Sequence, residues 1–193
     1  MMISRRALLA GSAAIVAGAA HCCGFDGALD AGFGYVHPRA MDVALAVRQA
    51  VGDGLLDVDA LAPLAPGADG LWRATEQLRL FGQALSASSA PGRPPLALLL
   101  AEASLWTRYA ADDRIYECRV HASGPAAGDA TLVSDRAVLA AINSGRLRCA
   151  DALAHSLIVI DAPGARVASD FLSTVAPAGT SALAARAAWS RAR

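Results

Sequence analysis

The feature that most constrains the fold of this chain is a change of hydrophobic period, from helical spacing to strand spacing, across residues 86–95. Between positions 71 and 85, apolar residues recur every three or four positions, which predicts an amphipathic helix with one buried face. The helical pattern stops in a stretch that contains Pro91, Gly92 and a Pro-Pro pair. Beyond it, short apolar runs of strand length predominate. We therefore expect an α+β fold in which N-terminal helices precede a mostly antiparallel sheet of about five strands packed on helices.

Two helices are expected before this break. The first follows Pro38 and ends at Gly52 or Gly54, because glycines commonly stop a helix. Its residues at helical spacing are Met41, Ala44, Leu45, Arg48 and Val51. After a connector rich in proline and glycine, Asp69 is expected to act as the N-cap of the second helix. The buried face of that helix is expected to consist of Leu71, Ala74, Leu78, Phe81 and Leu85.

The first strands are expected directly after the break. Residues 96–101 form a continuous apolar run of strand length, and residues 105–109 and 114–122 flank Ala-Ala-Asp-Asp as the arms of a hairpin. In the first arm, Trp106 and Tyr109 fit either a pocket lining or the core. In the second arm, apolar and polar residues alternate, which predicts one buried face. The expected buried residues of that arm are Tyr116, Cys118 and Val120.

The rest of the chain shows short helical and strand patterns in turn. A strand at residues 130–133 leads into a helix that Ser134 or Asp135 caps and that stops at residues 143–145. The elements expected after it are a helix at 151–155, a strand at 157–160, a turn at 162–164 and helices at 167–175 and 181–189.

The N-terminus has the pattern of an export signal. Arg5 and Arg6 precede an uncharged run, residues 7–20, whereas a membrane-spanning helix needs about 20 apolar residues. Adjacent arginines, a mildly apolar segment and small residues before a polar break are typical of a twin-arginine signal peptide. We expect the mature protein in the periplasm or outside a bacterial cell, with the twin-arginine export machinery as a partner and no transmembrane segment. The predicted organisation is a signal peptide at 1–21, a loop and helical segment at 22–68 and an α+β domain at 69–193.

The four cysteines bear on anchoring, on disulfides and on metal binding. Cys22 and Cys23 follow the leader, but His21 precedes them where lipoprotein processing needs a small residue. A lipid anchor is therefore a less favoured alternative, as is an uncleaved cytoplasmic N-terminus. Cys118 and Cys149 fit either a disulfide or two buried thiols, so the disulfide state of the four cysteines stays open. No metal site is predicted, because no thiolates have the CxxC spacing.

Charge and motif content argue against several classes of function. The 17 basic residues are all arginine and are interspersed with 17 acidic residues, so no basic footprint for nucleic acid is present. The sequence has no HExxH, nucleophile elbow, P-loop or CxxC motif, and we expect neither catalytic residues nor a cofactor. His121 is interpreted as an exposed strand residue. An enzymatic interpretation requires His121 to meet Glu117, Asp129 or Asp112 in a cleft.

Five short segments in the second half of the chain follow the pattern of a known family. In order they are GDATLVSD at 128–135, VLAAI at 138–142, GRL at 145–147, DAL at 151–153 and LIVI at 157–160. This series resembles sterol carrier protein type 2 domains. Those domains have, in order, an Asp-led strand, a helix, a Gly-basic-Leu step, a short helix and a further strand.

The resemblance extends over roughly residues 128–175, about a quarter of the chain. That family places one glycine just before the last strand and another just after it. Here His155-Ser156 and Asp161-Ala162 stand at these positions, and Gly164 is expected to serve the second turn.

The resemblance implies an α+β fold whose sheet and helices enclose an apolar tunnel for acyl chains, sterols or similar molecules, with no chemistry required. The wall candidates that it suggests are Leu132, Val138, Leu139, Ile142, Leu147, Leu153 and Phe171. The same residues would fill a solid core in an ordinary globular domain. The resemblance does not extend to the N-terminal helical part, which could be a lid, a dimer contact or a separate partner-binding element.

Three classes of function follow from the sequence. The favoured one is an exported non-catalytic protein, a structural or accessory partner of an exported complex, because the twin-arginine route carries folded proteins. The alternative is a binding protein for a hydrophobic small molecule. An enzyme is the least favoured class, since no catalytic signature is present. Exposed apolar surface on the helix that contains Leu71 would favour the accessory class.

Overall fold

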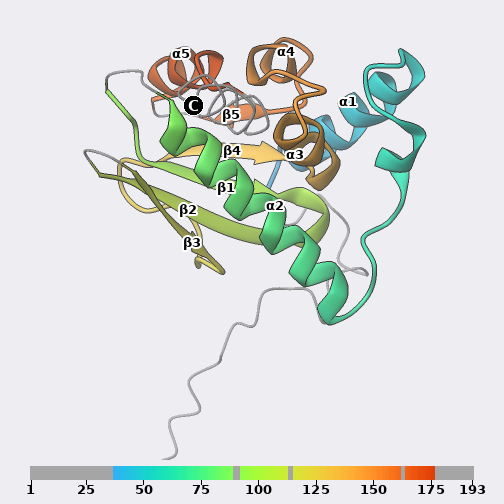
Figure 1. Ribbon diagram of the computed structural model, residues 1–193, viewed down its shortest axis with the longest axis horizontal. Coiled ribbons are helices and arrows are strands. Elements are labelled where there is room, and N and C mark those ends of the chain that lie inside the picture. The colour runs from blue at the N-terminus through green and yellow to red at the C-terminus, as the bar shows by residue number, and fades with distance from the viewer. Residues whose placement is uncertain (1–36, 89–91, 113–114, 162–163, 177–193) are drawn as a thin grey trace, which may run out of the picture.

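The structure is a computed structural model that describes residues 37–88, 92–112, 115–161 and 164–176. Its elements form a five-stranded sheet with helices on both faces, and the predicted α+β class is confirmed (Figure 1). The predicted signal residues Arg5 and Arg6, the pair Cys22 and Cys23, and the helix expected at 181–189 lie outside the described residues.

The sheet has the strand order β3-β2-β1-β4-β5. Its strands are β1 (Leu96–Leu100), β2 (Leu105–Ala111), β3 (Tyr116–Val120), β4 (Ala130–Ser134) and β5 (Val159–Asp161). All neighbouring pairs are antiparallel except β1 and β4, which run parallel, with Leu96 opposite Ala130 and Leu100 opposite Ser134. Because parallel neighbours end at the same edge of a sheet, the residues that follow β1 and β4 come close together.

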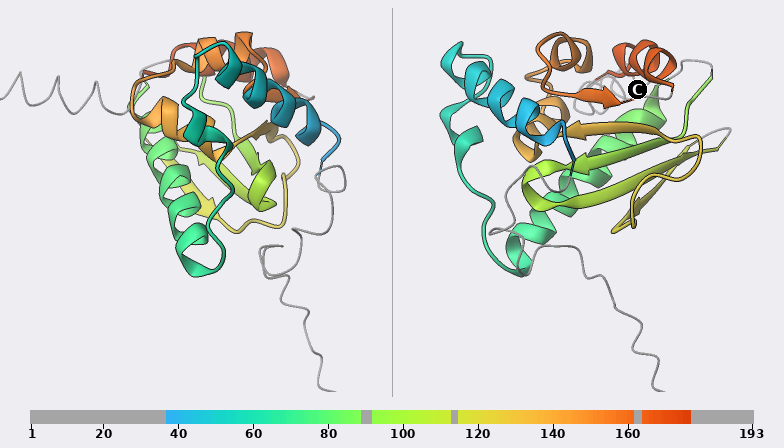
Figure 2. Two further views of the ribbon diagram at one scale, coloured as in Figure 1. Left: turned by 90° about the vertical axis from the view of Figure 1, so that its right-hand side faces the viewer. Right: turned by 180° about the vertical axis from the view of Figure 1, so that it is seen from behind.

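The helices lie on both faces of this sheet. They are α1 (Ala40–Gly52), α2 (Ala68–Ala87), α3 (Arg136–Asn143), α4 (Cys149–Ala154) and α5 (Ala165–Ser173), with 3₁₀ turns η3 (Val58–Leu61) and η4 (Ala101–Ala103). Helix α2 crosses one face, where Tyr109 of β2 donates a hydrogen bond to the carbonyl of Leu78 (2.9 Å), and α3 packs beside α2 (Figure 1). Helix α1 covers β4 on the opposite face, as the view from behind shows (Figure 2).

The coverage on both faces explains the burial of the strands. Every residue of β1 and β4 is buried, which agrees with the continuous apolar run predicted at 96–101. On β3, Tyr116 is buried and Cys118 and Val120 are half-buried, whereas Glu117 and Arg119 are exposed, so the predicted alternation is confirmed. Helix α1 contributes to the same hydrophobic core as the sheet.

Helix α1 forms where the sequence predicted a first helix, from Ala40 to Gly52. The residues of α1 that face the core are Ala40, Val43, Val47 and Ala50. Met41 and Leu45, which the sequence shows at helical spacing, are 49 % and 59 % exposed. Both stripes repeat at helical spacing, so periodicity did not distinguish them. The stripe of alanine and valine lies against the sheet, and the two larger side chains point to solvent.

Several element boundaries differ from prediction by a few residues, and two of them have a clear local cause. Helix α2 begins at Ala68 with Gly67 as its N-cap, so the predicted cap Asp69 lies in the first turn instead. Gly67 has a φ of 74°, a conformation that glycine adopts readily, and this bend starts the helix earlier. The last strand begins at Val159 rather than at residue 157, because the preceding amides bond to the carbonyl of Ala152 at the end of α4. Of the two candidate caps of α3, Asp135 serves, and its carboxylate accepts a hydrogen bond from the Ala137 amide (2.7 Å).

Candidate functional site

The most unusual group of charges in the described part of the chain lies where β1 and β4 end. Glu102 lies on η4, directly after β1, and Asp135 and Arg136 follow β4 at the start of α3. The parallel pairing of the two strands brings these three side chains to one edge of the sheet. In open sheets, the crevice beyond the carboxyl ends of parallel strands is a common place for ligand sites.

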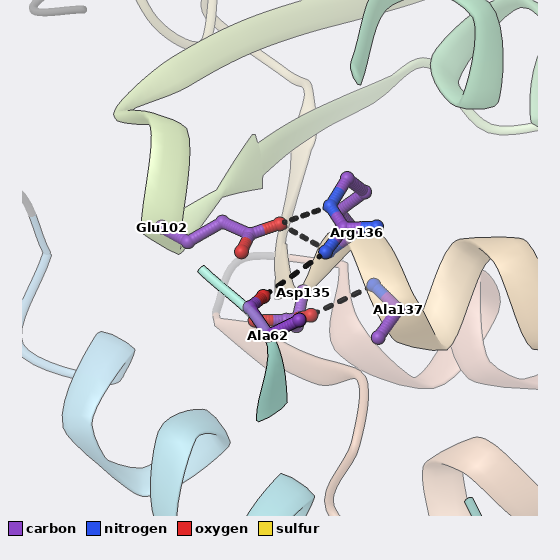
Figure 3. Close-up of polar contacts among 5 residues, drawn as sticks. All are labelled: Ala62, Glu102, Asp135, Arg136 and Ala137. Carbon is purple, nitrogen blue, oxygen red and sulfur yellow. Dashed lines mark hydrogen bonds and ion pairs between the residues drawn. The ribbon is translucent and has the colours of Figure 1, made fainter. Parts of the chain in front are cut away.

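Arg136 is the centre of this cluster (Figure 3). One carboxylate oxygen of Glu102 accepts hydrogen bonds from the backbone amide of Arg136 (3.2 Å) and from its Nε atom (3.1 Å). The Nη2 atom of Arg136 donates to the carbonyl of Ala62, in the connector between η3 and α2 (3.3 Å). A single guanidinium therefore joins three segments that are far apart in the sequence.

Burial dominates the electrostatics of the two carboxyl groups. The side chain of Glu102 is 13 % exposed. Its burial, and then the nearby charge of Asp135, raise the pKa of Glu102 to about 7, although Arg136 acts in the opposite direction. Burial also raises the pKa of Asp135, against the hydrogen bond from Ala137 and the charge of Arg136. The charge of Arg136 acts on both carboxyl groups, so their titrations are linked.

A hollow of about 160 Å³ lies beside this cluster, between η3 and α3. Its charged lining residues are Asp57, Asp59, Arg136 and Arg146, and Arg146 forms an ion pair with Asp57. The lining therefore carries two charges of each sign, which does not favour an anion over a cation. The other lining residues are Leu56, Ala60, Ala137 and Ala140.

A second hollow, of about 240 Å³, lies between α1 and α4. Its lining residues are Ala46, Gln49, Ala50, Asp53, Ala154, His155 and Ser156. Neither hollow is lined by any of the seven predicted wall residues.

The predicted wall residues come together in the core. Six of them are buried: Leu132, Val138, Leu139, Ile142, Leu147 and Phe171. Leu153 is half-buried and packs against the same cluster. The sequence thus identified residues of one connected interior between the sheet, α3, α4 and α5. A tunnel among them stays a prediction.

The residues considered for an enzymatic site have structural partners. Asp129 accepts two hydrogen bonds from the guanidinium of Arg108, at 2.6 and 3.1 Å, and Glu117 pairs with Arg119 at 3.3 Å. His121 is exposed and has a φ of 63° at the end of β3. The carboxylates of Asp129 and Glu117 are thus held by arginines.

The two aromatic residues left open by the sequence have different surroundings. Tyr109 is buried in the core, where its ring meets the edge of Phe81. Trp106 is half-buried on the opposite face of the sheet, with its ring 6.3 Å from that of His37. The Nδ1 atom of His37 accepts a hydrogen bond from the Arg39 amide (3.2 Å), and its Nε2 atom lies 3.6 Å from a carboxylate oxygen of Asp161.

The described cysteines, Cys118 and Cys149, are free thiols. Burial raises the pKa of Cys118 to about 11, partly offset by Arg79, and raises that of Cys149 to about 12. Both therefore stay protonated at neutral pH and are poor nucleophiles. Within the described ranges, no three His, Cys, Asp or Glu side chains are grouped so that they could hold a metal ion. None of the helices described has the length and apolar character needed to cross a membrane.

Sequence reasoning did not identify Glu102 or Arg136. Both are ordinary charged residues in the sequence, 34 positions apart. The signal that could have found them is positional, since each follows an apolar run that forms a central strand. Recognising it requires that the two runs pair in parallel, which the sequence pattern does not specify.

The fold and the cluster define an α+β protein with a buried acid and arginine group at the carboxyl edge of a parallel strand pair. Comparison with protein-family models, with curated proteins and with solved structures finds no match for this chain.

Proposed function

We propose that this protein is an exported, non-catalytic accessory protein that binds a protein partner through its N-terminal helical part. The observation that carries the proposal is the uneven distribution of exposed large apolar side chains. Of seven such residues in the described ranges, five lie between positions 41 and 72. We call these five the arm surface: Met41, Leu45, Val58, Leu61 and Trp72. The other two are Ile115 and Val167.

The arm surface is carried by α1, η3 and the first turn of α2. Met41 and Leu45 lie one turn apart on the side of α1 that faces away from the sheet, and Val58 on η3 is 72 % exposed. Trp72 is 66 % exposed, at the start of the helix for which exposed apolar surface was expected to favour an accessory role. Tryptophan is enriched among the residues that dominate binding energy at protein interfaces.

The charged groups favour a binding protein over an enzyme. In the candidate site, the Glu102 carboxylate and the Arg136 guanidinium are bound to each other. The Arg108 guanidinium and the Asp129 carboxylate are likewise paired. A catalytic acid or base must reach a proton of the substrate, whereas these two carboxylates accept hydrogen bonds from arginines of the chain itself.

Site-specific photo-crosslinking in the producing cell tests the proposal. A photoreactive residue at position 72 or 58 is expected to form an adduct with one protein, identified by mass spectrometry, whereas the same residue at position 115 or 167 forms no adduct with it. These control positions are matched, because Ile115 and Val167 are 57 % and 55 % exposed. Equal adducts from all four positions, or none from positions 72 and 58, would contradict an accessory role for this surface.

The alternative function, binding of a hydrophobic small molecule, is favoured by two backbone positions. Ser156 lies just before the last strand and has a φ of 56°, and Gly164 lies after that strand and has a φ of 90°. These left-handed conformations are the ones that glycine adopts most easily, and the sterol carrier family has glycine at such positions. Lipid extraction and mass spectrometry of the gently purified protein test this alternative. A stoichiometric lipid would support it, and a lipid-free protein that gains no stability from added fatty acid would oppose it.

A further inference from the structure

We propose that Glu102, Asp135 and Arg136 form a proton-controlled latch, which holds η3 and the connector after it against α3 and loosens when Glu102 loses its proton. The effect of this latch on partner binding rests on the proposed function of the arm surface. The latch itself is a property of the chain alone.

Few polar contacts join α3 to η3 and to the residues that flank it. Near the start of α3, Arg136 reaches the carbonyl of Ala62, and beyond its end Arg146 reaches the carboxylate of Asp57. Between these two contacts lies the hollow of about 160 Å³, so η3 and α3 are not closely packed there. Leu56 is buried in the core and Ala60 and Leu64 are partly buried against it, so the segment is anchored at these residues and is packed least closely at the hollow, where local opening is easiest.

The charged groups that face Glu102 come from α3 and its N-cap. They are Asp135, which repels the Glu102 carboxylate, and Arg136, which attracts it. The connector contributes only the Ala62 carbonyl, which accepts its hydrogen bond from the same guanidinium. Asp57, Asp59 and Arg146 lie around the neighbouring hollow. Loss of the proton from Glu102 therefore places a negative charge next to Asp135 in a buried site.

Whether a rise in pH opens or closes the latch depends on which of the two forms binds the Glu102 proton more tightly. In the closed latch, burial raises the pKa of Glu102 to about 7, whereas in an open, hydrated form it returns toward its ordinary value of 4.5. The closed form therefore holds the proton more tightly. Opening becomes more favourable as the pH rises from about 4.5 to about 7, and it changes little above that range. The latch is closed in mild acid and looser at neutral pH and above.

Loosening has a direct consequence for the arm surface. Val58 and Leu61 lie on η3, just before the connector, and Trp72 lies just after it. A change in the connector alters how these side chains are placed relative to one another. On the proposed function, the pH outside the cytoplasm then sets how well the partner is bound.

Amide hydrogen exchange between pH 5 and pH 8 tests the latch, with each rate corrected for the intrinsic pH dependence of exchange. The informative amides are those of Arg136, which donates to Glu102, and of Ala60 and Ala62, which close the turn of η3. Their protection factors are expected to fall together by at least tenfold as the pH rises. Protection that does not change with pH, or a fall at Arg136 without one at Ala62, would overturn the latch.

Two variants complete the test. Glu102→Gln is expected to remove the pH dependence at all three amides, while Glu117→Gln, a control at an exposed glutamate, is expected to keep it. Persistence of the pH dependence in Glu102→Gln would overturn the proposal. If that variant does not fold, the carboxyl carbon of Glu102 is titrated by NMR in the unmodified chain, where a pKa near 4.5 would overturn it equally. None of these measurements involves the partner. A negative result here would therefore contradict the latch without contradicting the proposed function, and a failed crosslinking test would leave the latch unaffected.

Discussion

At the scale of single residues, Ser156 is one of three described non-glycine residues with a positive φ, together with Ser104 and His121. Ser156 has a φ of 56°, in a region that costs a non-glycine residue roughly 1 kcal/mol. Its amide nevertheless bonds to the carbonyl of Leu153 and helps to end α4. The tertiary structure therefore imposes a turn that the side chain opposes.

The first prediction concerns this turn. Ser156→Gly is expected to raise the free energy of unfolding by about 0.5–1 kcal/mol, because glycine adopts the left-handed conformation without a steric cost. Chemical denaturation measures this gain. The control is Ser144→Gly at the C-cap of α3, where φ is an ordinary −82° and glycine relieves no strain; because the Ser144 hydroxyl bonds to the Ala141 carbonyl and to Arg146, this variant is expected to lose stability. A loss of stability in Ser156→Gly, or an equal gain in both variants, would contradict the account of the turn.

The second prediction concerns the stability of the whole chain against pH. Because the pKa of Glu102 is raised in the folded state, its contribution to stability is fully present below the unfolded pKa and is lost as the pH rises toward 7. The free energy of unfolding is expected to fall by about 1–3 kcal/mol from this group between pH 4.5 and pH 7.

The isosteric variant Glu102→Gln provides the decisive comparison for this prediction. It is expected to be at least as stable as the native chain at pH 8, because the raised pKa of Glu102 means that the folded state favours a neutral side chain at this position. Urea unfolding at pH 5 and at pH 8 measures both proteins. A variant that is much less stable at pH 8 would show that the ion pair outweighs the cost of burial.

At the scale of elements, the sequence predicted most helices and strands but not which of their faces meet. The apolar run of β1 and the alternation of β3 were found because strand period and burial are directly linked. Periodicity alone did not indicate the buried face of α1, because the stripe of Met41 and Leu45 and the stripe of alanine and valine both repeat at helical spacing. The parallel pairing of β1 and β4, which creates the candidate site, depends on contacts between distant segments.

The third prediction tests the start of α2, where the connector folds back on the helix. A Cβ atom at Gly70 would overlap the carbonyl oxygen of Ala65, so Gly70→Ala must displace backbone. We expect a loss of about 2–4 kcal/mol, although alanine is the better helix former by about 1 kcal/mol.

The control for this substitution is Gly52→Ala at the end of α1. A Cβ atom at Gly52 meets no atom within 4 Å, so only the gain in helix propensity remains. This variant is expected to match the native chain or to exceed its stability slightly. Thermal unfolding of both variants measures the difference, and equal effects at the two glycines would be inconsistent with the close contact at Gly70.

At the scale of the whole molecule, the class of fold was predictable because it depends on patterns that repeat along the chain. The candidate site was not, since Glu102 and Arg136 become neighbours only through the sheet. For the predicted wall residues, the sequence predicted burial but could not predict a cavity. A buried apolar residue is easy to recognise in a sequence, whereas a cavity beside it is not.

The fourth prediction concerns the export of the chain. Replacing Arg5 and Arg6 by lysines is expected to stop its translocation, because the twin-arginine pathway reads that pair. Cell fractionation measures the exported fraction. The same experiment in cells without the twin-arginine machinery serves as the control, and unchanged export there would contradict the assignment of the leader.

The central claim, that the arm surface binds a protein partner, is tested most directly by the affinity of the purified protein for the partner that crosslinks to it. The double variant Val58→Ser/Trp72→Ser removes two of its most exposed apolar side chains, and Ile115→Ser/Val167→Ser removes two comparable ones elsewhere. We predict a Kd at least tenfold weaker for the first variant and a change of less than about twofold for the second. Equal affinities of the two variants would contradict the claim.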